Sequence, residues 1–283
     1  MLKKFKKTIS IRTKPINLKK VDEHLFVHEY KKIIHSSSVK TLKNVYVIGS
    51  RLKKYRHFRF AIKQQRMNPV NVLIKIKYFL SDLREFIFNH STLKPIIIER
   101  ATWAIDSRSN QYFHWLTDGM QRVNVAKEFL IEYPIVLTEN FNNTTFIKES
   151  LEFLNLNPIY LDHNKNYLIK ELILSERVSP AGNYRKEIIN EISDNFKSLI
   201  PYNSVTDIHK YIWISRQNTE RRKVENFDDI KEILLKYGFH ILEFENISFF
   251  DQVKIMSRCE ILAGVHGAGL VNMLFMKNAG KVI

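Results

Sequence analysis

Apolar strand-like segments alternate with helix-like segments from residue 211 to the last residue, and this alternation restricts the fold more than any other feature of the sequence. Strands are predicted at 211–215, 239–244 and 260–265, and a fourth begins at 281. Helices are predicted at 227–237, 248–258 and 270–275. Asn226 precedes the first helix and Gly238 follows it, and Ser248 begins the second. Such a succession predicts a parallel, Rossmann-like sheet. These domains usually continue to five or six strands, so we expect a fragment or an unusually finished domain.

The preceding part of the chain shows the same alternation less clearly. Strands are predicted at 45–48, 95–98, 135–137, 158–161 and 167–175, and helices at 111–129, 144–154 and 185–199. The polar segment 201–206 separates the two parts and predicts a domain boundary. We therefore expect an α/β protein with a basic arm at 1–40, a Rossmann-like domain at 41–203 and an incomplete one at 204–283.

Positive charge is concentrated at the front of the chain. Residues 1–80 contain 21 Lys and Arg against three acidic residues, whereas the remaining 203 residues contain 24 basic and 26 acidic ones. This asymmetry indicates an anionic partner such as a lipid surface, a nucleic acid or an acidic polymer. Charges interrupt the apolar stretch 70–88, so it predicts an amphipathic helix, most simply a core helix, rather than a membrane span. The single cysteine, Cys259, excludes a disulfide framework and fits a reducing compartment.

The loop Gly264-Val-His-Gly-Ala-Gly269 joins a predicted strand to a predicted helix. Ligands of such sheets bind at the carboxyl ends of strands, and small residues let backbone amides approach an anion at a helix N-terminus. The glycine spacing matches neither the dinucleotide fingerprint nor a P-loop. His266 offers a further donor to a phosphate oxygen. We therefore predict an anion site in this loop.

Arginine residues follow the strand at 211–215, at Arg216, Arg221 and Arg222. The planar guanidinium group suits bidentate contacts with phosphate. Arginines in a loop are more often a solvated surface. Here, however, the strand end and the His266 loop belong to the same edge of one sheet, and this convergence favours a binding role.

A third group of polar residues lies on the predicted helix 111–129. His114, Asp118 and Arg122 are four residues apart, so their side chains are expected along one helical face. Tyr112 and neighbouring aromatic residues border that face, which favours a cleft wall. The alternative is an exposed helix on which Asp118 pairs with Arg122.

These residues together resemble glycosyltransferase family sixty-one, which includes bacterial capsular-polysaccharide enzymes, plant xylan-decorating transferases and protein O-N-acetylglucosamine transferases. The resemblance covers about residues 95–283 and is most specific in Gly264-Val-His-Gly-Ala-Gly-Leu-Val-Asn272-Met-Leu-Phe275. The segments Tyr211-Ile-Trp-Ile-Ser-Arg216 and Ser248-Phe-Phe-Asp-Gln252 and the His114 block also contribute. It implies a GT-B fold, two Rossmann-like domains facing a cleft, and inverting transfer without a metal.

The resemblance also implies roles for individual residues. The diphosphate of a nucleotide sugar would contact the glycine loop and the arginines, and the nucleotide pocket would include two further polar residues. The residues concerned are His266, Gly267, Ala268, Gly269, Arg216, Arg221 or Arg222, Glu245 and Asn272. Asp118 would be the general base, with His114 as the second choice or as a group that orients Asp118.

The chemistry of inverting transfer agrees with these roles. The acceptor hydroxyl loses a proton as it attacks, and the leaving diphosphate gains charge. Metal-dependent transferases usually present Asp-x-Asp at a strand end. The comparable pairs here are Glu243/Glu245, and Asp228/Asp229 at a helix beginning, where first-turn acids are expected. We therefore expect no metal and no cofactor beyond the nucleotide sugar, with arginine and the His266 loop stabilising the leaving group.

Two alternatives belong to other functional classes: a nucleic-acid-binding protein with a basic arm, and an inactive transferase-like scaffold. The first accounts for the basic front and leaves the His266 loop unexplained, so we expect no nucleic-acid partner. We expect a saccharide or lipid-linked saccharide acceptor, and a cytoplasmic protein whose basic region contacts an anionic membrane surface. The sequence does not identify the donor sugar or the acceptor.

Overall fold

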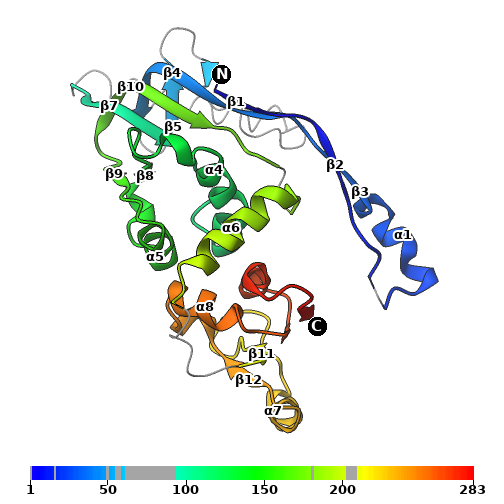
Figure 1. Ribbon diagram of the computed structural model, residues 1–283. Coiled ribbons are helices and arrows are strands. Elements are labelled where there is room, and N and C mark those ends of the chain that lie inside the picture. The colour runs from blue at the N-terminus through cyan, green and yellow to red at the C-terminus, as the bar shows by residue number, and fades with distance from the viewer. Residues whose placement is uncertain are drawn as a thin grey trace.

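The computed structural model contains two α/β regions and a projecting N-terminal arm (Figure 1). It describes residues 2–15, 17–48, 51–54, 59–60, 94–106, 108–179, 182–201 and 209–283. The amphipathic helix predicted at 70–88 lies outside these residues. Within the described part of the chain, no helix combines the length and the hydropathy needed to cross a membrane.

The N-terminal region is built on a mixed sheet with the strand order β6-β5-β4-β10-β7, and β1 pairs with β4 at one end. The strands are β1 (Lys3–Phe5), β4 (Ser37–Ile48), β5 (Arg51–Lys54), β6 (Arg59–Phe60), β7 (Ile96–Trp103) and β10 (Asn166–Ser175). β10 is parallel to β7 and antiparallel to β4. The prediction of a mainly parallel sheet is wrong for this region, because β1, β4, β5 and β6 pair in antiparallel fashion.

Two further parallel strands continue this region beyond β7. β8 (Val136–Thr138) pairs with β9 (Ile159–Leu161), and an isolated parallel bridge links Thr102 of β7 to Ile135. The carboxyl ends of β7, β8, β9 and β10 therefore point the same way. Side chains that follow these strands gather at one edge, where ligands of open α/β sheets bind.

The helix predicted at 111–129 is a series of shorter helical segments. α3 (Tyr112–His114) leads into a π-helical turn, η4 (Trp115–Gly119), followed by α4 (Met120–Val125) and η5 (Lys127–Phe129). The amide of Met120 donates to the carbonyl of Trp115, five residues earlier. A Cβ on Gly119 would lie 2.8 Å from the Trp115 ring, so this turn requires a glycine.

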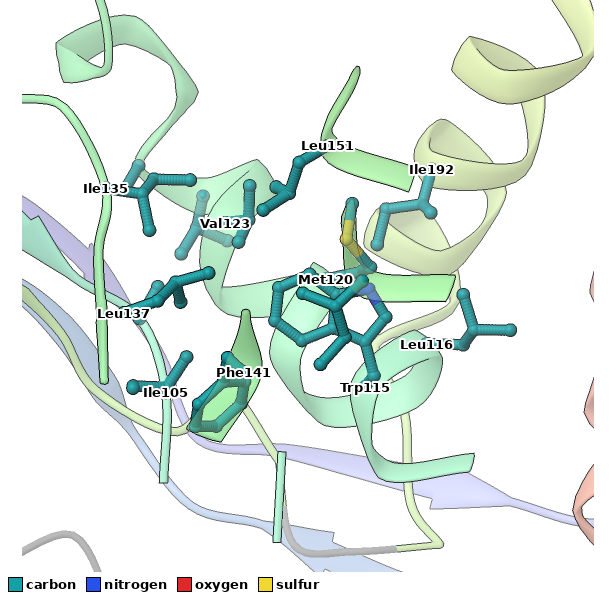
Figure 2. Packing of buried hydrophobic residues seen from close by; sticks show 14 of the residues in the cluster. Ile105, Trp115, Leu116, Met120, Val123, Ile135, Leu137, Phe141, Leu151 and Ile192 are labelled. Carbon is teal, nitrogen blue, oxygen red and sulfur yellow. The ribbon is translucent and has the colours of Figure 1, made fainter. Parts of the chain in front are cut away.

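Trp115 is at the centre of the N-terminal core. It is fully buried, and its indole Nε1 donates to Ser150 Oγ of α5 (Thr145–Phe153) at 2.8 Å. Figure 2 shows it packed with Met120 and Leu116, near Ile192 of α6 (Lys186–Ser198). This packing fixes the position of the polar residues on the same helical segment.

The C-terminal region confirms the predicted alternation. Its elements are β11 (Tyr211–Ile214), α7 (Phe227–Lys236), β12 (His240–Leu242), η8 (Phe244–Asn246), α8 (Phe249–Met256), β13 (Ile261–Gly264), η9 (Ala268–Phe275) and β14 (Lys281–Val282). The four strands are parallel in the order β12-β11-β13-β14. Gly238 has a φ of +75° after α7, and Ser248 Oγ accepts from the Asp251 amide at 3.1 Å. η9 is a 3₁₀ helix, tighter than the α-helix its sequence suggests.

An aromatic cluster joins the two regions. Phe196 of α6 contacts Phe249 of α8 and Phe275 of η9, with ring centroids 5.1 and 5.7 Å apart. Ser193 Oγ also donates to the Leu274 carbonyl at 2.6 Å. The predicted boundary at 203/204 falls in residues 202–208, outside the described residues, and the regions on either side pack together through this aromatic cluster.

The arm comprises residues 8–34 and projects from the N-terminal region (Figure 1). β2 (Thr8–Ile11) pairs with β3 (Lys31–Ile34), and η1 (Lys20–Asp22), α1 (Glu23–Phe26) and η2 (Val27–Glu29) form its tip. The arm is shorter than the expected 1–40, because β1 and the beginning of β4 belong to the main sheet.

Candidate functional site

A cleft of about 710 Å³ lies between the two regions. The N-terminal region contributes Tyr112, residues 143–146 and Glu149 to its wall. The C-terminal region contributes the residues that follow β11, β12 and β13, at the carboxyl edge of its parallel sheet. The cleft therefore occupies the place at which this kind of sheet binds ligands.

Arg216 lies in the cleft wall against the glycine loop. A Cβ on Gly267 would come 3.1 Å from Arg216 Cζ and closer still to Nη1, so the guanidinium group rests directly on this glycine. Arg216 Nη2 donates to the Arg221 carbonyl at 3.2 Å. Its Nε is buried and has no hydrogen-bond partner among the described residues. Burial of a guanidinium N–H without an acceptor lowers the stability of the folded protein, and a bound anion would supply the missing acceptor.

The other arginines and His266 shape the loop rather than the cleft wall. Arg222 Nη1 donates to the His266 carbonyl at 3.0 Å, and Arg222 has a φ of +63°. Arg221 and His266 are exposed, and neither side chain lines the cleft. The structure thus brings the arginine segment and the glycine loop together as expected, with Arg216 as the arginine that reaches the cleft.

The first turn of η9 completes this part of the wall. Gly267, Ala268 and Gly269 all line the cleft. The first amides of a helix have no acceptor within the helix, and they carry partial positive charge. Together with Arg216, these amides make this end of the cleft suited to an anion.

Asn272 lies beneath the cleft instead of in its wall. It is fully buried; its Nδ2 donates to the Gly269 carbonyl at 3.0 Å and to Gln252 Oε1 at 3.1 Å. The Tyr112 hydroxyl lies 2.8 Å from both Asn272 Oδ1 and Gln252 Oε1. Burial raises the pKa of Tyr112, so its hydroxyl stays a proton donor. Asn272 therefore fixes the glycine loop and connects it to the N-terminal region.

Two glutamates face the cleft with different roles. Glu149 Oε2 accepts the Phe249 amide at 2.6 Å and so caps the beginning of α8 from across the cleft. Glu245 follows β12 and is exposed in the cleft wall. The related Glu243 accepts from the side chains of Asn218 and Asn246 at 2.6 and 3.0 Å. The strand predicted at 239–244 is too long, because β12 ends at Leu242 and both Glu243 and Glu245 follow it.

His114 and Asp118 form a hydrogen-bonded pair. His114 Nδ1 lies 2.8 Å from Asp118 Oδ2; 15% of the imidazole is exposed and 1% of the carboxylate. Asp118 Oδ1 is buried without a hydrogen-bond partner in the described part of the chain. With Nδ1–H donated to the carboxylate, Nε2 is the nitrogen left to accept a proton. Neither residue lines the 710 Å³ cleft.

Arg122 points into the core instead of lying beside His114 and Asp118. The prediction that these three residues form a cleft wall is therefore wrong. Arg122 is fully buried, and its Nε donates to the Ser175 carbonyl at 2.9 Å. Burial lowers its pKa to about 10, which still leaves it charged at neutral pH. The π-helical turn between His114 and Arg122 adds a residue to the helical repeat, and packing then turns Arg122 into the core.

A buried charge network supports the pair from behind. Asp106 pairs with Arg177, and Arg122 Nη1 lies 3.7 Å from Asp106 Oδ2. Arg177 Nη1 lies 3.9 Å from Asp118 Oδ2. Burial alone would raise the pKa of Asp106, but the two arginines outweigh it and hold that pKa below its usual value. Asp106 and Arg177 follow β7 and β10, a strand-end position that could have identified them from sequence.

One group of described side chains has the spacing of a metal site: Glu139, Asp162 and His163. They follow β8 and β9, and none lines the cleft. His163 Nδ1 lies 2.8 Å from Glu139 Oε2, and Lys165 pairs with Asp162 at 3.4 Å. These exposed pairs satisfy the group internally.

Comparisons with known proteins show which sequences this chain resembles. The sequence model described as Glycosyltransferase 61 matches residues 112–283, more than half of the chain. The EGF domain-specific O-linked N-acetylglucosamine transferase of Drosophila melanogaster is 34% identical over 82 residues. That match covers 28% of this chain and only 16% of the relative. The family match includes the His114–Asp118 pair, Arg216 and the glycine loop, and the chain belongs to the glycosyltransferase 61 family.

Proposed function

We propose that the protein transfers a sugar, with inversion, from a nucleotide-diphosphate donor to a hydroxyl of a saccharide acceptor. The observation that carries this proposal is Arg216, held against Gly267 in the cleft wall with its Nε–H unsatisfied. In a GT-B arrangement, the C-terminal region would hold the donor and the N-terminal region the acceptor. The parallel β12-β11-β13-β14 sheet and the cleft at its carboxyl edge support this division.

On the donor side, the diphosphate would lie between Arg216 and the amides of Gly267 to Gly269. Arg222 holds the loop through the His266 carbonyl, and Asn272 holds it through Gly269. Glu245 follows the second strand of its sheet, the position from which an acidic residue often binds ribose hydroxyls. Contacts of Arg221 and the His266 side chain with the donor stay predictions.

On the acceptor side, we assign proton acceptance to His114, with Asp118 orienting it. The choice of Asp118 as the base stays a prediction, but its carboxylate is 1% exposed and bonded to the imidazole. A buried carboxylate behind a histidine fixes the tautomer and stabilises the imidazolium that forms. Since the pair lies outside the cleft lining, acceptor binding would bring the hydroxyl between Nε2 and the donor.

The reaction is a single displacement. The acceptor oxygen bonds to the anomeric carbon as the bond from that carbon to the diphosphate oxygen breaks. The acceptor proton passes to His114 Nε2, and the diphosphate leaves with the bonding electron pair. Arg216 and the loop amides stabilise that added charge, and each charge-assisted hydrogen bond contributes about 1.5–3 kcal/mol.

We propose that these groups act without a metal ion. Two observations support this: Glu149 Oε2 accepts the Phe249 amide, and the group formed by Glu139, Asp162 and His163 lies away from the cleft. The test is turnover of the nucleotide sugar in excess EDTA, with activity expected to persist. Loss of activity in EDTA that magnesium restores would refute metal independence without refuting transfer.

Donor binding is tested by thermal unfolding with a panel of nucleoside diphosphates. A ligand that binds only the folded protein raises Tm, and Arg216→Ala should remove most of the rise. The proposal fails, and the chain is an inactive scaffold, if no nucleoside diphosphate raises Tm and no nucleotide sugar is turned over.

The base is tested by His114→Ala and Asp118→Asn, each expected to lower kcat by about 10²–10⁴ while nucleotide binding persists. His163→Ala is a matched control, because His163 forms a similar 2.8 Å pair with Glu139 away from the cleft. A His114→Ala enzyme with near-normal kcat would place the base elsewhere.

For the biological setting, we propose capsular or other surface polysaccharide synthesis on the cytoplasmic side of a bacterial membrane. The family resemblance of the sequence supports this. The Drosophila relative is named for transfer of N-acetylglucosamine to EGF domains, so a protein acceptor is the competing outcome. Acceptor trials with saccharides and with folded EGF domains distinguish the two.

A further inference from the structure

The arm carries apolar side chains that no described residue of the chain covers. In the β2–β3 hairpin, Ile9 is directly opposite Ile33, and Ile11 follows on the same face. These three side chains are 48%, 46% and 82% exposed. At the tip, Val21 and Val27 are 72% and 60% exposed. Exposed apolar side chains gathered on one small projection indicate an interaction site.

The same arm is basic. Residues 8–34 contain six Lys and Arg and three acidic residues. Two of the acids are neutralised within the arm, because Glu23 pairs with Lys14 and Glu29 pairs with Arg12 and Lys32. Lys19, Lys20 and Lys31 are exposed and have no acidic partner among the described residues. Free positive charge thus surrounds the exposed apolar groups.

We propose that the arm docks on an anionic lipid bilayer, with Ile11 and the tip inserted at headgroup level and the unpaired lysines on lipid phosphates. Apolar insertion combined with basic residues is what interfacial membrane binding requires. A second copy of the chain would bring two surfaces of the same positive sign together. Single-stranded nucleic acid would favour aromatic platforms, whereas the most exposed groups here are aliphatic.

The arm and the segment before it contact residues that follow β10, at the carboxyl end of the parallel strands β7 to β10. Arg12 bonds to the Gly182 carbonyl and to Asn183 Oδ1, and Arg185 donates to the Lys6 carbonyl at 2.7 Å. Tyr184, between those contacts, lies beside Thr117 of the π-helical turn. A bilayer under the arm would therefore bring lipid headgroups to the side of the His114–Asp118 pair. This consequence, which rests on the proposed function, favours a lipid-linked acceptor.

The test is flotation of the full chain with vesicles of phosphatidylcholine alone and with 30% phosphatidylglycerol. We expect binding to the anionic vesicles only, weakening as salt rises. Lys19→Gln with Lys20→Gln should weaken binding about 30-fold, from about fivefold for each basic residue near the surface. Ile11→Ser should weaken it about tenfold or more, the loss expected for one buried aliphatic side chain.

Matched controls use exposed residues away from the arm. Ile131→Ser replaces an isoleucine that is 97% exposed on the body, and Lys236→Gln with Lys281→Gln removes two exposed lysines of the C-terminal region. Both controls should bind vesicles like the parent chain. All variants should keep the parent Tm and its shift with a nucleoside diphosphate, so failure of docking is distinct from failure of the proposed function.

Three results would overturn the proposal. The first is equal binding to neutral and anionic vesicles. The second is an arm variant that binds no more weakly than its control. The third is a different occupant: RNA binding with a steep salt dependence and no vesicle binding, or a dimer in sedimentation that Ile11→Ser dissociates.

Discussion

Gly267→Ala tests the central feature of the donor site, the contact between Arg216 and the glycine loop. Gly267 has a φ of −174° and a ψ of 171°, an extended conformation that alanine also adopts. The new Cβ would lie under 3.0 Å from Arg216 Nη1, a separation that real Cβ atoms essentially never show. The atoms that must move belong to the end of a flexible side chain. We therefore expect the guanidinium group to retreat while the backbone stays in place.

The size of the effect follows from that displacement. A retreat of roughly 1 Å takes a charge-assisted hydrogen bond out of its productive geometry. Loss of one such bond costs about 1.5–3 kcal/mol, which corresponds to a fall of about 10- to 150-fold in kcat/KM. The assay is steady-state turnover of the nucleotide sugar. The free energy of unfolding in urea should change by less than about 1 kcal/mol, because no buried group is lost.

A double-mutant cycle separates this mechanism from a general distortion of the loop. Arg216→Ala alone should lower kcat/KM, and adding Gly267→Ala to it should have little further effect. Additive losses would mean that alanine acts through the loop amides. A Gly267→Ala enzyme with parent kcat/KM would refute the role assigned to Arg216.

Three further predictions concern buried polar groups. Asp106→Asn leaves Arg122 with less compensating charge and should lower the free energy of urea unfolding by about 3 kcal/mol at pH 7. Because the folded-state pKa of Asp106 lies below its usual value, its ionic stabilisation is present above about pH 4 and is lost as pH falls through the folded value. The difference between the parent and Asp106→Asn should therefore narrow in urea titrations below pH 4, and a constant difference would contradict the ionic origin. Tyr112→Phe removes a hydroxyl that lies between two buried amide oxygens and should cost about 1–3 kcal/mol in the same assay. Tyr133→Phe, which removes a less buried hydroxyl bonded to Glu171, should lower the free energy of unfolding by less than Tyr112→Phe does.

The C-terminal region was predictable because its signals are local. Asn226 precedes α7, Gly238 follows it in the left-handed conformation, and Ser248 caps α8. Each of these acts within a few residues of the element that it limits. The meeting of Arg216 with Gly267 also follows from local information, since parallel neighbouring strands end at one edge.

The N-terminal sheet was harder to predict because its pairing is distant in sequence. β4 pairs with β10 from Val39 opposite Ser175 to Ile48 opposite Asn166. An apolar strand pattern does not specify the direction of a partner more than a hundred residues away. The same limit applies to Asn272, which occupies a signature segment but is buried by Tyr112 and Gln252 from other elements.

The pair at the acceptor side shows where sequence spacing stops being informative about chemistry. A separation of four residues suffices to bring His114 against Asp118, and it does so even through a π-helical turn. It leaves open which of the two groups meets solvent. That is decided by residues that follow strand ends, because Arg177, paired with Asp106, lies 3.9 Å from the buried carboxylate, whereas 15% of the imidazole is exposed. The proton acceptor is therefore a property of the packed sheet edge, and a substitution at Arg177 that exposes Asp118 should change the pH dependence of kcat without touching either member of the pair.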